Sequence, residues 1–320
     1  MTDTALKDDW TGVDALPWDV PDVAARLASV AELCQLPRRV ERLSGGLTNV
    51  NLKVTTPAGS YVARLYSSDG ALLAIDRDAE SHNTAAAAAA GVGAPVLAYR
   101  PEAMLLAVGF LPGRTYTPAD LRDHHNLDRV ATACRQLHAG PRFRGDFDMF
   151  EIQQRYLATV RDRGFRLPPR YEEFLPKVER IRAALAVKDV GTVPCNNDLL
   201  AGNFIDDGDR IWLIDYEYAG NNDACFELGN IWSEANLPLD LLEPMITSYY
   251  GRPRPSRVAR ARLLGLMSKY GWTLWASIQD GASALDFDFW GWGMEKYDRA
   301  VIEFDGPDFD HLLDEAARDD

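Results

Sequence analysis

The sequence predicts an α+β fold with two lobes: a small antiparallel-sheet lobe, then a larger, mostly helical one. Two observations carry this prediction. Residues 39–66 hold three β-rich runs separated by glycine- and proline-containing turns, which is typical of an antiparallel meander. From residue 117 onward helical periodicity dominates. Because Leu111-Pro112-Gly113 interrupts regular structure between these regions, we expect lobes at 1–112 and 113–320.

Glycine and proline residues mark the ends of the strands and of the helix in the first lobe. Gly45-Gly46 and Pro57-Ala58-Gly59 supply the turns, and Gly91 ends a long alanine-rich helix. The expected strands are 39–44, 49–54, 61–66, 95–99 and 104–110, with the helix at about 71–90.

The second lobe is expected to be helical with one exception. Its predicted helices are 117–138, 152–163, 171–186, 226–235, 239–250, 255–279 and 287–304. The exception is a strand pair, 204–205 and 211–214, around the turn Asp206-Asp207-Gly208-Asp209.

The amino-acid composition restricts the classes of ligand that the protein is expected to bind. The 320 residues carry a formal net charge of −14, which repels phosphate backbones and disfavours nucleic-acid binding. The same field weakly favours a small cation. The four cysteines and five histidines are scattered, without the spacing of a zinc site.

Nothing in the chain indicates membrane insertion. The N-terminus lacks a basic segment followed by an apolar run, and the apolar stretch 85–98 is short and broken by glycine and proline. We therefore expect a cytoplasmic protein. The oligomeric state stays open, with a homodimer among the alternatives.

The most informative stretch is 193–220, which places Asp198, Asn203, Asp215 and Glu217 beside the apolar run 211–214. Asp198 and Asn203 fit the pattern D-x-x-x-x-N, and the strand pair returns Asp215 beside Asn203. This arrangement is typical of phosphoryl-transfer enzymes of the protein-kinase type, in which the first Asp orients the attacking hydroxyl and the Asn and second Asp hold Mg²⁺. The alternative is a turn with solvated acidic residues.

The first lobe adds two features of the same chemistry. The turn Ser44-Gly45-Gly46-Leu47-Thr48-Asn49 lies between two predicted strands, where backbone N–H groups can approach phosphates. Arg64, in the middle of a strand, has a plausible carboxylate partner in Glu80 on the next helix, as in the kinase clamp on the α- and β-phosphates. The alternatives are an ordinary turn and an edge-strand surface charge.

The segment 270–297 is rich in aromatic residues, far above the 10% of the whole chain. Trp272 and Trp275 share one helix face, and Phe289 and Trp292 have the same spacing on the next helix. Such a wall is either a helix–helix core seam or an aromatic cage for a quaternary ammonium group.

Together these motifs resemble the choline/ethanolamine kinase branch of the aminoglycoside-phosphotransferase-like kinases. The resemblance covers about residues 39–304. Its motifs, in the family's order, are SGGLTN, VARLY, AESHN, FLPGRT, LH (137–138), CNNDLLAGN, IDYEYAG and FELGNIWSE. It implies a two-lobed protein-kinase-like fold, with ATP and Mg²⁺ as cofactors and a small cationic amino alcohol as substrate.

The resemblance also assigns site residues. It makes Asp198 the catalytic aspartate and Asn203 and Asp215 the magnesium ligands. The nucleotide-binding residues are Ser44, Gly45, Gly46, Asn49, Arg64, Glu80, Phe110 and Leu111. The substrate-binding residues are Tyr218, Glu234, Trp272, Trp275, Phe289 and Trp292.

Two positions depart from the family pattern. Asn196 stands where the family commonly has His two residues before the catalytic Asp, and Glu227 stands where choline kinases often have Asp. Because asparagine also donates and accepts hydrogen bonds, we expect activity to be retained.

The sequence therefore predicts an ATP- and Mg²⁺-dependent kinase of the hydroxyl of choline or a related amino alcohol. One alternative is a kinase of another small hydroxylated molecule, such as an aminoglycoside, thiamine or methylthioribose. A second, from a different class, is a non-catalytic kinase-like binding protein.

Overall fold

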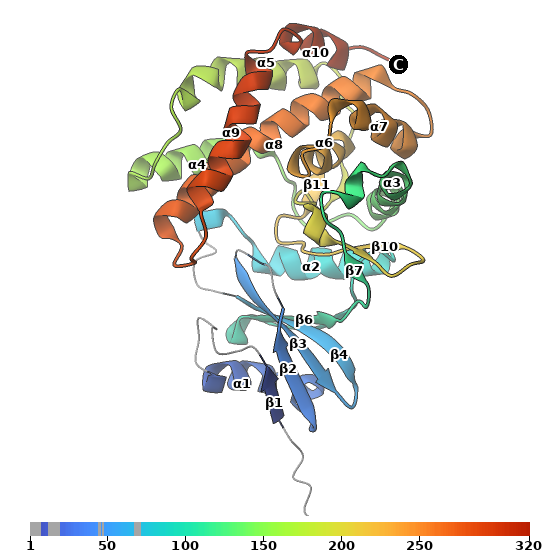
Figure 1. Ribbon diagram of the computed structural model, residues 1–320, viewed down its shortest axis with the longest axis vertical. Helices are drawn as coiled ribbons and strands as arrows, with labels where there is room; N and C mark the ends of the chain where they lie inside the picture. The colour runs from blue at the N-terminus through green and yellow to red at the C-terminus, as the bar shows by residue number, and fades with distance from the viewer. Residues whose placement is uncertain (1–7, 12–19, 44–45, 47, 67–71) are drawn as a thin grey trace, which may run out of the picture.

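The computed structural model describes residues 8–11, 20–43, 46, 48–66 and 72–320. They form a sheet lobe, at the bottom of Figure 1, and a larger helical lobe above it. The predicted α+β fold with two lobes is thereby confirmed.

The sheet lobe is built on six strands in the order β1-β2-β3-β4-β6-β5. They are β1 (Asp8–Thr11), β2 (Arg38–Arg42), β3 (Asn49–Thr56), β4 (Gly59–Tyr66), β5 (Val96–Arg100) and β6 (Leu105–Gly109). The predicted meander is confirmed as β2, β3 and β4, which pair antiparallel. The sequence analysis missed β1, because its short polar sequence has no alternation and only its parallel pairing with β2 makes it a strand.

A small apolar core supports this sheet. The helix α1 (Val20–Ala28), also not expected, supplies Val23 and Leu27. They belong to one cluster with Val40 of β2 and Leu52 of β3, and all four side chains are fully buried. The sheet therefore has its own core beside that of the helical lobe.

The helix α2 (Arg77–Ala89) lies between the sheet and the helical lobe (Figure 1). It begins later than predicted, where the Asp76 side chain caps it by accepting from the Ala79 N–H at 3.0 Å. Its Asn83 donates to the carbonyl of Ala219 at 2.8 Å and accepts from the N–H of Arg144 at 2.7 Å. Side-chain hydrogen bonds therefore tie α2 to the helical lobe.

The chain crosses between the lobes at residues 110–113. The N–H of Phe110 still bonds to Ser60 of the sheet, whereas β7 (Arg114–Thr115) pairs with the hairpin of the helical lobe. Gly113 has φ +153°, and a Cβ there would lie 2.6 Å from the Asp206 carbonyl oxygen. The chain therefore needs glycine at position 113. The lobe boundary at 112/113 stays a prediction.

Among the described residues, the helical lobe contains eight α-helices and, besides β7, four short strands. The helices are α3 (His124–His138), α4 (Met149–Arg163), α5 (Leu175–Ala186), α6 (Ala224–Glu234), α7 (Leu242–Tyr250), α8 (Pro255–Ala282), α9 (Phe289–Phe304) and α10 (Phe309–Ala316). The strands are β8 (Val193–Cys195), β9 (Phe204–Asp206), β10 (Ile211–Leu213) and β11 (Gly220–Asn222).

Most of these helices match the predictions within a few residues. The first begins at His124, because Asp123 caps it there and residues 120–122 form a separate 3₁₀ turn. The helix α10 and the pair β8–β11 were not expected. No helix in the described part of the chain has the length and apolar character to cross a membrane.

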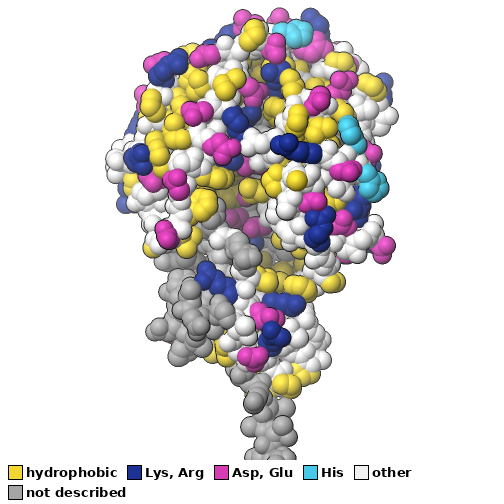
Figure 2. Space-filling view, viewed as in Figure 1, with side chains coloured by type: hydrophobic (Ala, Val, Ile, Leu, Met, Phe, Trp, Pro, Cys, Tyr) yellow, Lys and Arg dark blue, Asp and Glu magenta, His cyan; other side chains and the backbone are white. Residues whose placement is uncertain are grey.

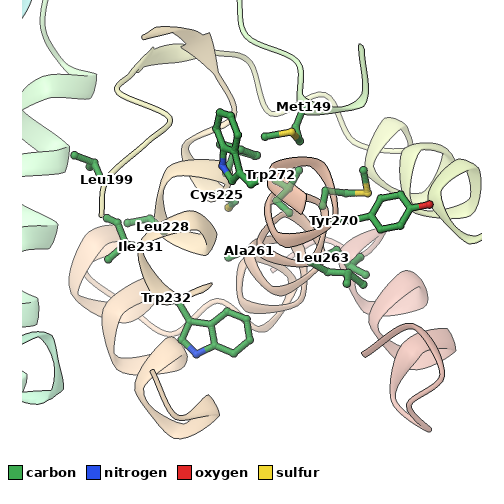
Figure 3. Close-up of a cluster of buried hydrophobic side chains, with 14 of the residues drawn as sticks. Met149, Leu199, Cys225, Leu228, Ile231, Trp232, Ala261, Leu263, Tyr270 and Trp272 are labelled. Atoms are coloured by element: carbon green, nitrogen blue, oxygen red, sulfur yellow. The ribbon is translucent and has the colours of Figure 1, made fainter. Parts of the chain in front are cut away.

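The long helix α8 organises this lobe. It packs against α4, α6, α9 and α10 and is buried along most of its length. Figure 3 shows Trp272 of α8 beside Met149 of α4 and Cys225 of α6, within one apolar cluster. The backbones of α6 and α8 approach closely at Gly229 and Gly265, with no room for a side chain between them.

We predict that Gly229→Ala destabilises the protein. An ideal Cβ at Gly229 would lie 2.1 Å from the Ala261 carbonyl oxygen and 2.9 Å from the Gly265 nitrogen, so α6 and α8 must separate. Overpacking of this kind costs about 1–3 kcal/mol. Thermal unfolding measures the loss. Gly202→Ala is the control, because nothing lies within 4 Å of its added Cβ. Equal melting temperatures for the two variants would contradict the close approach.

Candidate active site

The loop after β8 carries Asp198, and the side chain of Asn196 holds it in place. The Asn196 Oδ1 accepts from the N–H of Asp198 at 3.1 Å. Its Nδ2 donates to the carbonyls of Ile214 and Asp215, at 3.1 and 2.8 Å. One buried amide thus connects the loop of Asp198 to the end of β10.

A buried trio lies beneath this loop. The carboxylate of Glu227 accepts from the backbone N–H groups of Asn196 and Asn197, at 2.8 and 2.7 Å. Ligand-type atoms of His138, Cys195 and Glu227 lie within 4.8 Å of one another. Both carboxylate oxygens already accept backbone N–H groups, and His138 Nδ1 lies 2.7 Å from the hydroxyl of Tyr249. The trio therefore supports the loop through existing hydrogen bonds.

The hairpin β9–β10 brings the other two predicted residues to Asp198. The Asn203 Nδ2 donates to the Asp198 carbonyl at 2.7 Å, and the N–H of Ile214 donates to the Asn203 carbonyl at 3.0 Å. Asp215 follows with φ +66°, in the left-handed region that aspartate tolerates better than most residues. The hydrogen bonds confirm that Asp198, Asn203 and Asp215 lie close together, as predicted.

The charge environment of Asp198 is unusual. Burial raises the pKa of Asp198 well above its ordinary value, and the nearby carboxylates of Glu234, Asp215 and Glu217 raise it further. The ammonium of Lys296 acts in the opposite direction. A carboxylate of higher pKa binds a proton more tightly than an ordinary aspartate does.

Arg64 of β4 reaches two carboxylates across the lobe interface. Its Nη1 lies 2.7 Å from the Oε1 of Glu80 and 2.6 Å from the Oδ1 of Asp215. Burial alone would lower the pKa of Arg64, but the charges of Asp215 and Glu80 raise it well above its ordinary value. The predicted pair of Arg64 with Glu80 is confirmed, and the contact with Asp215 connects it to the hairpin.

A second buried cluster surrounds Glu217. Its carboxylate accepts from Thr48 and Asn49 of the sheet lobe, at 2.8 and 2.9 Å. Arg77 of α2 donates to Glu217 at 3.2 Å, to Asn49 Oδ1 at 2.9 Å and to Glu80 at 2.8 Å. Asn49, predicted to bind the nucleotide, thus uses its amide to join the lobes.

A cavity of about 470 Å³ lies between the lobes. Arg64, Glu80, Asn203 and Asp215 line it. Gly46, Phe110 and Leu111 line it too, and Ser44 and Gly45 fall outside the described residues. In the space-filling view, acidic side chains lie in a recess between the two lobes (Figure 2).

These residues fit a magnesium–nucleotide complex. The carboxylate of Asp215 and the amide oxygen of Asn203 are hard oxygen ligands of the type that Mg²⁺ takes. The Asn203 amide nitrogen is already engaged with the Asp198 carbonyl, which leaves its oxygen for a ligand. The mostly apolar walls near Phe110 suit a nucleotide base.

The predicted substrate residues also come together. The Trp275 Nε1 donates to the hydroxyl of Tyr218 at 2.9 Å, and the ring of Trp272 meets that of Tyr218 edge-on at 4.9 Å. The Trp275 ring lies 5.8 Å from that of Phe289 and 5.5 Å from that of Trp292. Four of the five rings are buried, so they form a packed aromatic seam.

Glu234, the remaining predicted substrate residue, lies at the end of α6 beside this aromatic group. Its Oε2 accepts from the ammonium of Lys296, which also lies 4.0 Å from the centre of the Trp292 ring. Sequence reasoning did not select Lys296, Arg77 or Glu217 as site residues. Lys296 lies within the aromatic-rich segment 270–297 but carries no motif of its own, and only the packing of α9 on α8 and the contact with Glu234 reveal it.

Comparisons with known proteins agree with this geometry. The chain matches the family described as choline/ethanolamine kinase over residues 40–247. It is 28% identical to a probable ethanolamine kinase of Arabidopsis thaliana, over 81% of this chain and 77% of that protein. It is 27% identical to ethanolamine kinase 2 of Mus musculus, over 82% of this chain and 75% of that protein.

Solved structures show the same fold. A choline/ethanolamine kinase family protein from Mesorhizobium loti superposes with a TM-score of 0.81 at 28% identity, covering 93% of this chain and 98% of that one. The GDP complex of aminoglycoside 2'-phosphotransferase-IIIa gives a TM-score of 0.57 at 14% identity, covering 82% and 91%. These matches confirm the predicted kinase-like fold.

An ion pair between Arg129 and Asp206 connects the β9–β10 hairpin to α3. Arg129 binds Asp206 in a bidentate manner, at 2.6 and 2.7 Å. The hydrogen bonds from Arg129 are the main cause that lowers the pKa of Asp206 to about 2. Since this pKa lies below the unfolded value, the pair stabilises the fold above about pH 4 and less as the pH falls toward 2.

We therefore predict a pH-dependent effect of Arg129→Met. The variant should lose about 1 kcal/mol of unfolding free energy at pH 7, an amount discounted for partial solvent exposure. The difference from the parent should narrow toward pH 3, as urea unfolding at both pH values would measure. Arg161→Met is the control, because its partner Glu172 is exposed and the loss should be near zero. A difference that is constant with pH would refute the role of the pair.

Proposed function

Because the chain belongs to the choline/ethanolamine kinase family, we propose that it transfers the γ-phosphoryl group of ATP to the hydroxyl of choline, ethanolamine or a related amino alcohol. The observation that carries this proposal is the grouping of Asp198 with Asn203 and Asp215, two residues that line a cavity together with the Arg64–Glu80 pair. The sheet lobe, 1–112, would bind the nucleotide. The helical lobe, 113–320, would hold the catalytic loop and the substrate.

The residues fit an in-line transfer. Asp198 would accept the proton of the substrate hydroxyl, whose oxygen bonds to the γ-phosphorus as the bond to the bridging oxygen of ADP breaks. Arg64, fixed by Glu80, would pair with the phosphates. Asn203 and Asp215 would hold Mg²⁺, which would neutralise phosphate charge. Catalysis of this kind is mainly positioning and electrostatics.

The substrate class follows from the aromatic group and Glu234. An ammonium group is stabilised by aromatic faces and by a carboxylate, and these residues lie on α6, α8 and α9 beside the loop of Asp198. An aminoglycoside carries several amines and would need several carboxylates where this chain has tryptophans. A non-catalytic binding protein would have no need of the complete set of Asp198, Asn203 and Asp215.

The proposal is tested by a coupled ADP-release screen over ethanolamine, choline, aminoglycosides, thiamine and methylthioribose. Amino alcohols should support turnover and the other acceptors should not. Turnover with an aminoglycoside alone would replace the proposed substrate class. Binding of Mg·ATP without turnover on any acceptor would favour the non-catalytic alternative.

We predict that Asp198→Asn keeps the fold and ATP binding but lowers kcat about 10²–10⁴-fold, because the proton acceptor is lost. Asp209→Asn makes the same chemical change in the exposed turn of the neighbouring hairpin and should leave kcat unchanged. Near-parental kcat in a folded Asp198→Asn variant would remove Asp198 from the catalytic role.

We predict that Asp215→Ala abolishes turnover at ordinary Mg²⁺ concentrations and that high Mg²⁺ rescues part of it, because the main anionic ligand is lost. The measurement is kcat over a Mg²⁺ titration at saturating ATP, with Asp209→Ala as the control. If the Asp215 variant showed the parent's Mg²⁺ dependence, Asp215 would not be a metal ligand.

A further inference from the structure

The proposed cation subsite already contains a cation that belongs to the protein. The ammonium of Lys296, on α9, donates to the Oε2 of Glu234, at the end of α6. The same ammonium lies 4.0 Å from the centre of the Trp292 ring. The Lys296 and Glu234 side chains are 5% and 2% exposed. One carboxylate oxygen and one aromatic face are therefore engaged before any substrate binds.

The other carboxylate oxygen of Glu234 is free. Its Oε1 is buried and has no hydrogen-bond partner among the described residues. A buried acceptor without a donor is costly, and a carboxylate oxygen has lone pairs for more than one donor. The Oε1 of Glu234 can therefore still accept a hydrogen bond from an N–H or O–H group.

This position lies beside the proposed substrate residues. Lys296, which binds Glu234, also contacts the ring of Trp292. The rings of Trp292 and Trp275 lie 5.5 Å apart, and Trp275 donates to Tyr218. Glu234 and Lys296 are therefore part of one continuous group with the proposed substrate residues.

A second buried lysine–glutamate pair has hydrogen bonds to both carboxylate oxygens. Lys269 of α8 donates to Glu303 Oε1 and lies 4.6 Å from the centre of the Trp232 ring. There the other oxygen of Glu303 accepts from Arg262 at 3.4 Å. A lysine, a glutamate and a tryptophan recur in both places, but only Glu234 keeps an oxygen without a partner.

The two amine types of the proposed substrate class differ in what they offer such a site. A primary ammonium has three N–H donors and can bond to Glu234 Oε1. A trimethylammonium group has none, and is held instead by several aromatic faces. At Glu234 it would leave the oxygen without a hydrogen bond, and at Trp292 it would meet the Lys296 ammonium.

We propose that this site selects amino alcohols whose nitrogen carries an N–H, with Lys296 as the residue that disfavours the quaternary ammonium. The inference rests on the proposed amino-alcohol kinase function and names its substrate class. Lys296 donates to one oxygen of Glu234 and covers one face of Trp292. The other oxygen of Glu234 therefore favours a substrate nitrogen that can donate a hydrogen bond.

The first test is a substrate series on the unmodified protein: ethanolamine, its N-methyl and N,N-dimethyl derivatives, and choline. Each step adds one methyl group, but only the last removes the final N–H. We expect kcat/KM to fall by about tenfold or more at that last step, the range of an unmade buried hydrogen bond. An even decline, or a preference for choline, would overturn the proposal.

The second test compares Lys296→Met with Lys269→Met. Both changes remove a buried ammonium that pairs with a glutamate over a tryptophan, so both are expected to lower the melting temperature. Only Lys296→Met frees the Trp292 face, so the choline-to-ethanolamine ratio of kcat/KM should rise about thirtyfold, the value of a desolvated cation–π contact. In Lys269→Met the ratio should stay that of the parent.

The outcomes separate the two proposals. A ratio that is unchanged in a folded Lys296→Met variant, or changed equally in both variants, would make the Lys296–Glu234 pair structural and overturn the inference alone. If Lys296→Met does not fold, the substrate series on the unmodified protein decides the question. Absence of turnover on every amine of the series would instead refute the proposed function.

Discussion

The active-site region depends on the neutralisation of carboxylates that lie together in a mostly buried place. Asp215, Glu217 and Glu234 pair with Arg64, Arg77 and Lys296, which come from β4, α2 and α9. Charges in such surroundings are tolerated only when they are paired and hydrogen-bonded. The pairs therefore fix the sheet lobe and α2 on the hairpin, and α9 on α6. They explain why a run of acidic residues beside an apolar strand is compatible with a stable fold.

The same pairing shapes the chemistry. Arg64 is shared between Glu80 and Asp215, and both line the cavity between the lobes. A ligand that brings phosphate groups and a divalent cation would offer each of these groups a new partner of opposite charge. Asp198 has no ion pair among the described residues, and its raised pKa follows from its burial near other carboxylates. The protein thus places these ion pairs and Asp198 within one site.

A scaffold of side-chain hydrogen bonds to the backbone supports these charges. Asn196 joins the loop of Asp198 to the end of β10, and Glu227 binds the backbone N–H groups on the other side of the loop. Where the family commonly has histidine, asparagine here makes three bonds of its own to the backbone. Its short, rigid amide suits a position whose neighbours Asn197 and Asp215 have left-handed backbone angles.

The sequence by itself determined the two-lobed α+β fold, the hairpin that returns Asp215 to Asn203 and the pairing of Arg64 with Glu80. Each follows from short-range signals: turn residues, the periods of helix and strand, and a motif of fixed spacing. Only the tertiary structure decided that Arg77 and Asn49 bind Glu217, and that Lys296 lies between Glu234 and Trp292. The hydrogen bonds to Glu217 and Glu234 join residues 62–168 positions apart, on elements whose approach is set by the packing of the whole fold. No local pattern specifies which side chains meet across such an interface, nor that one oxygen of Glu234 has no hydrogen-bond partner in the described part of the chain.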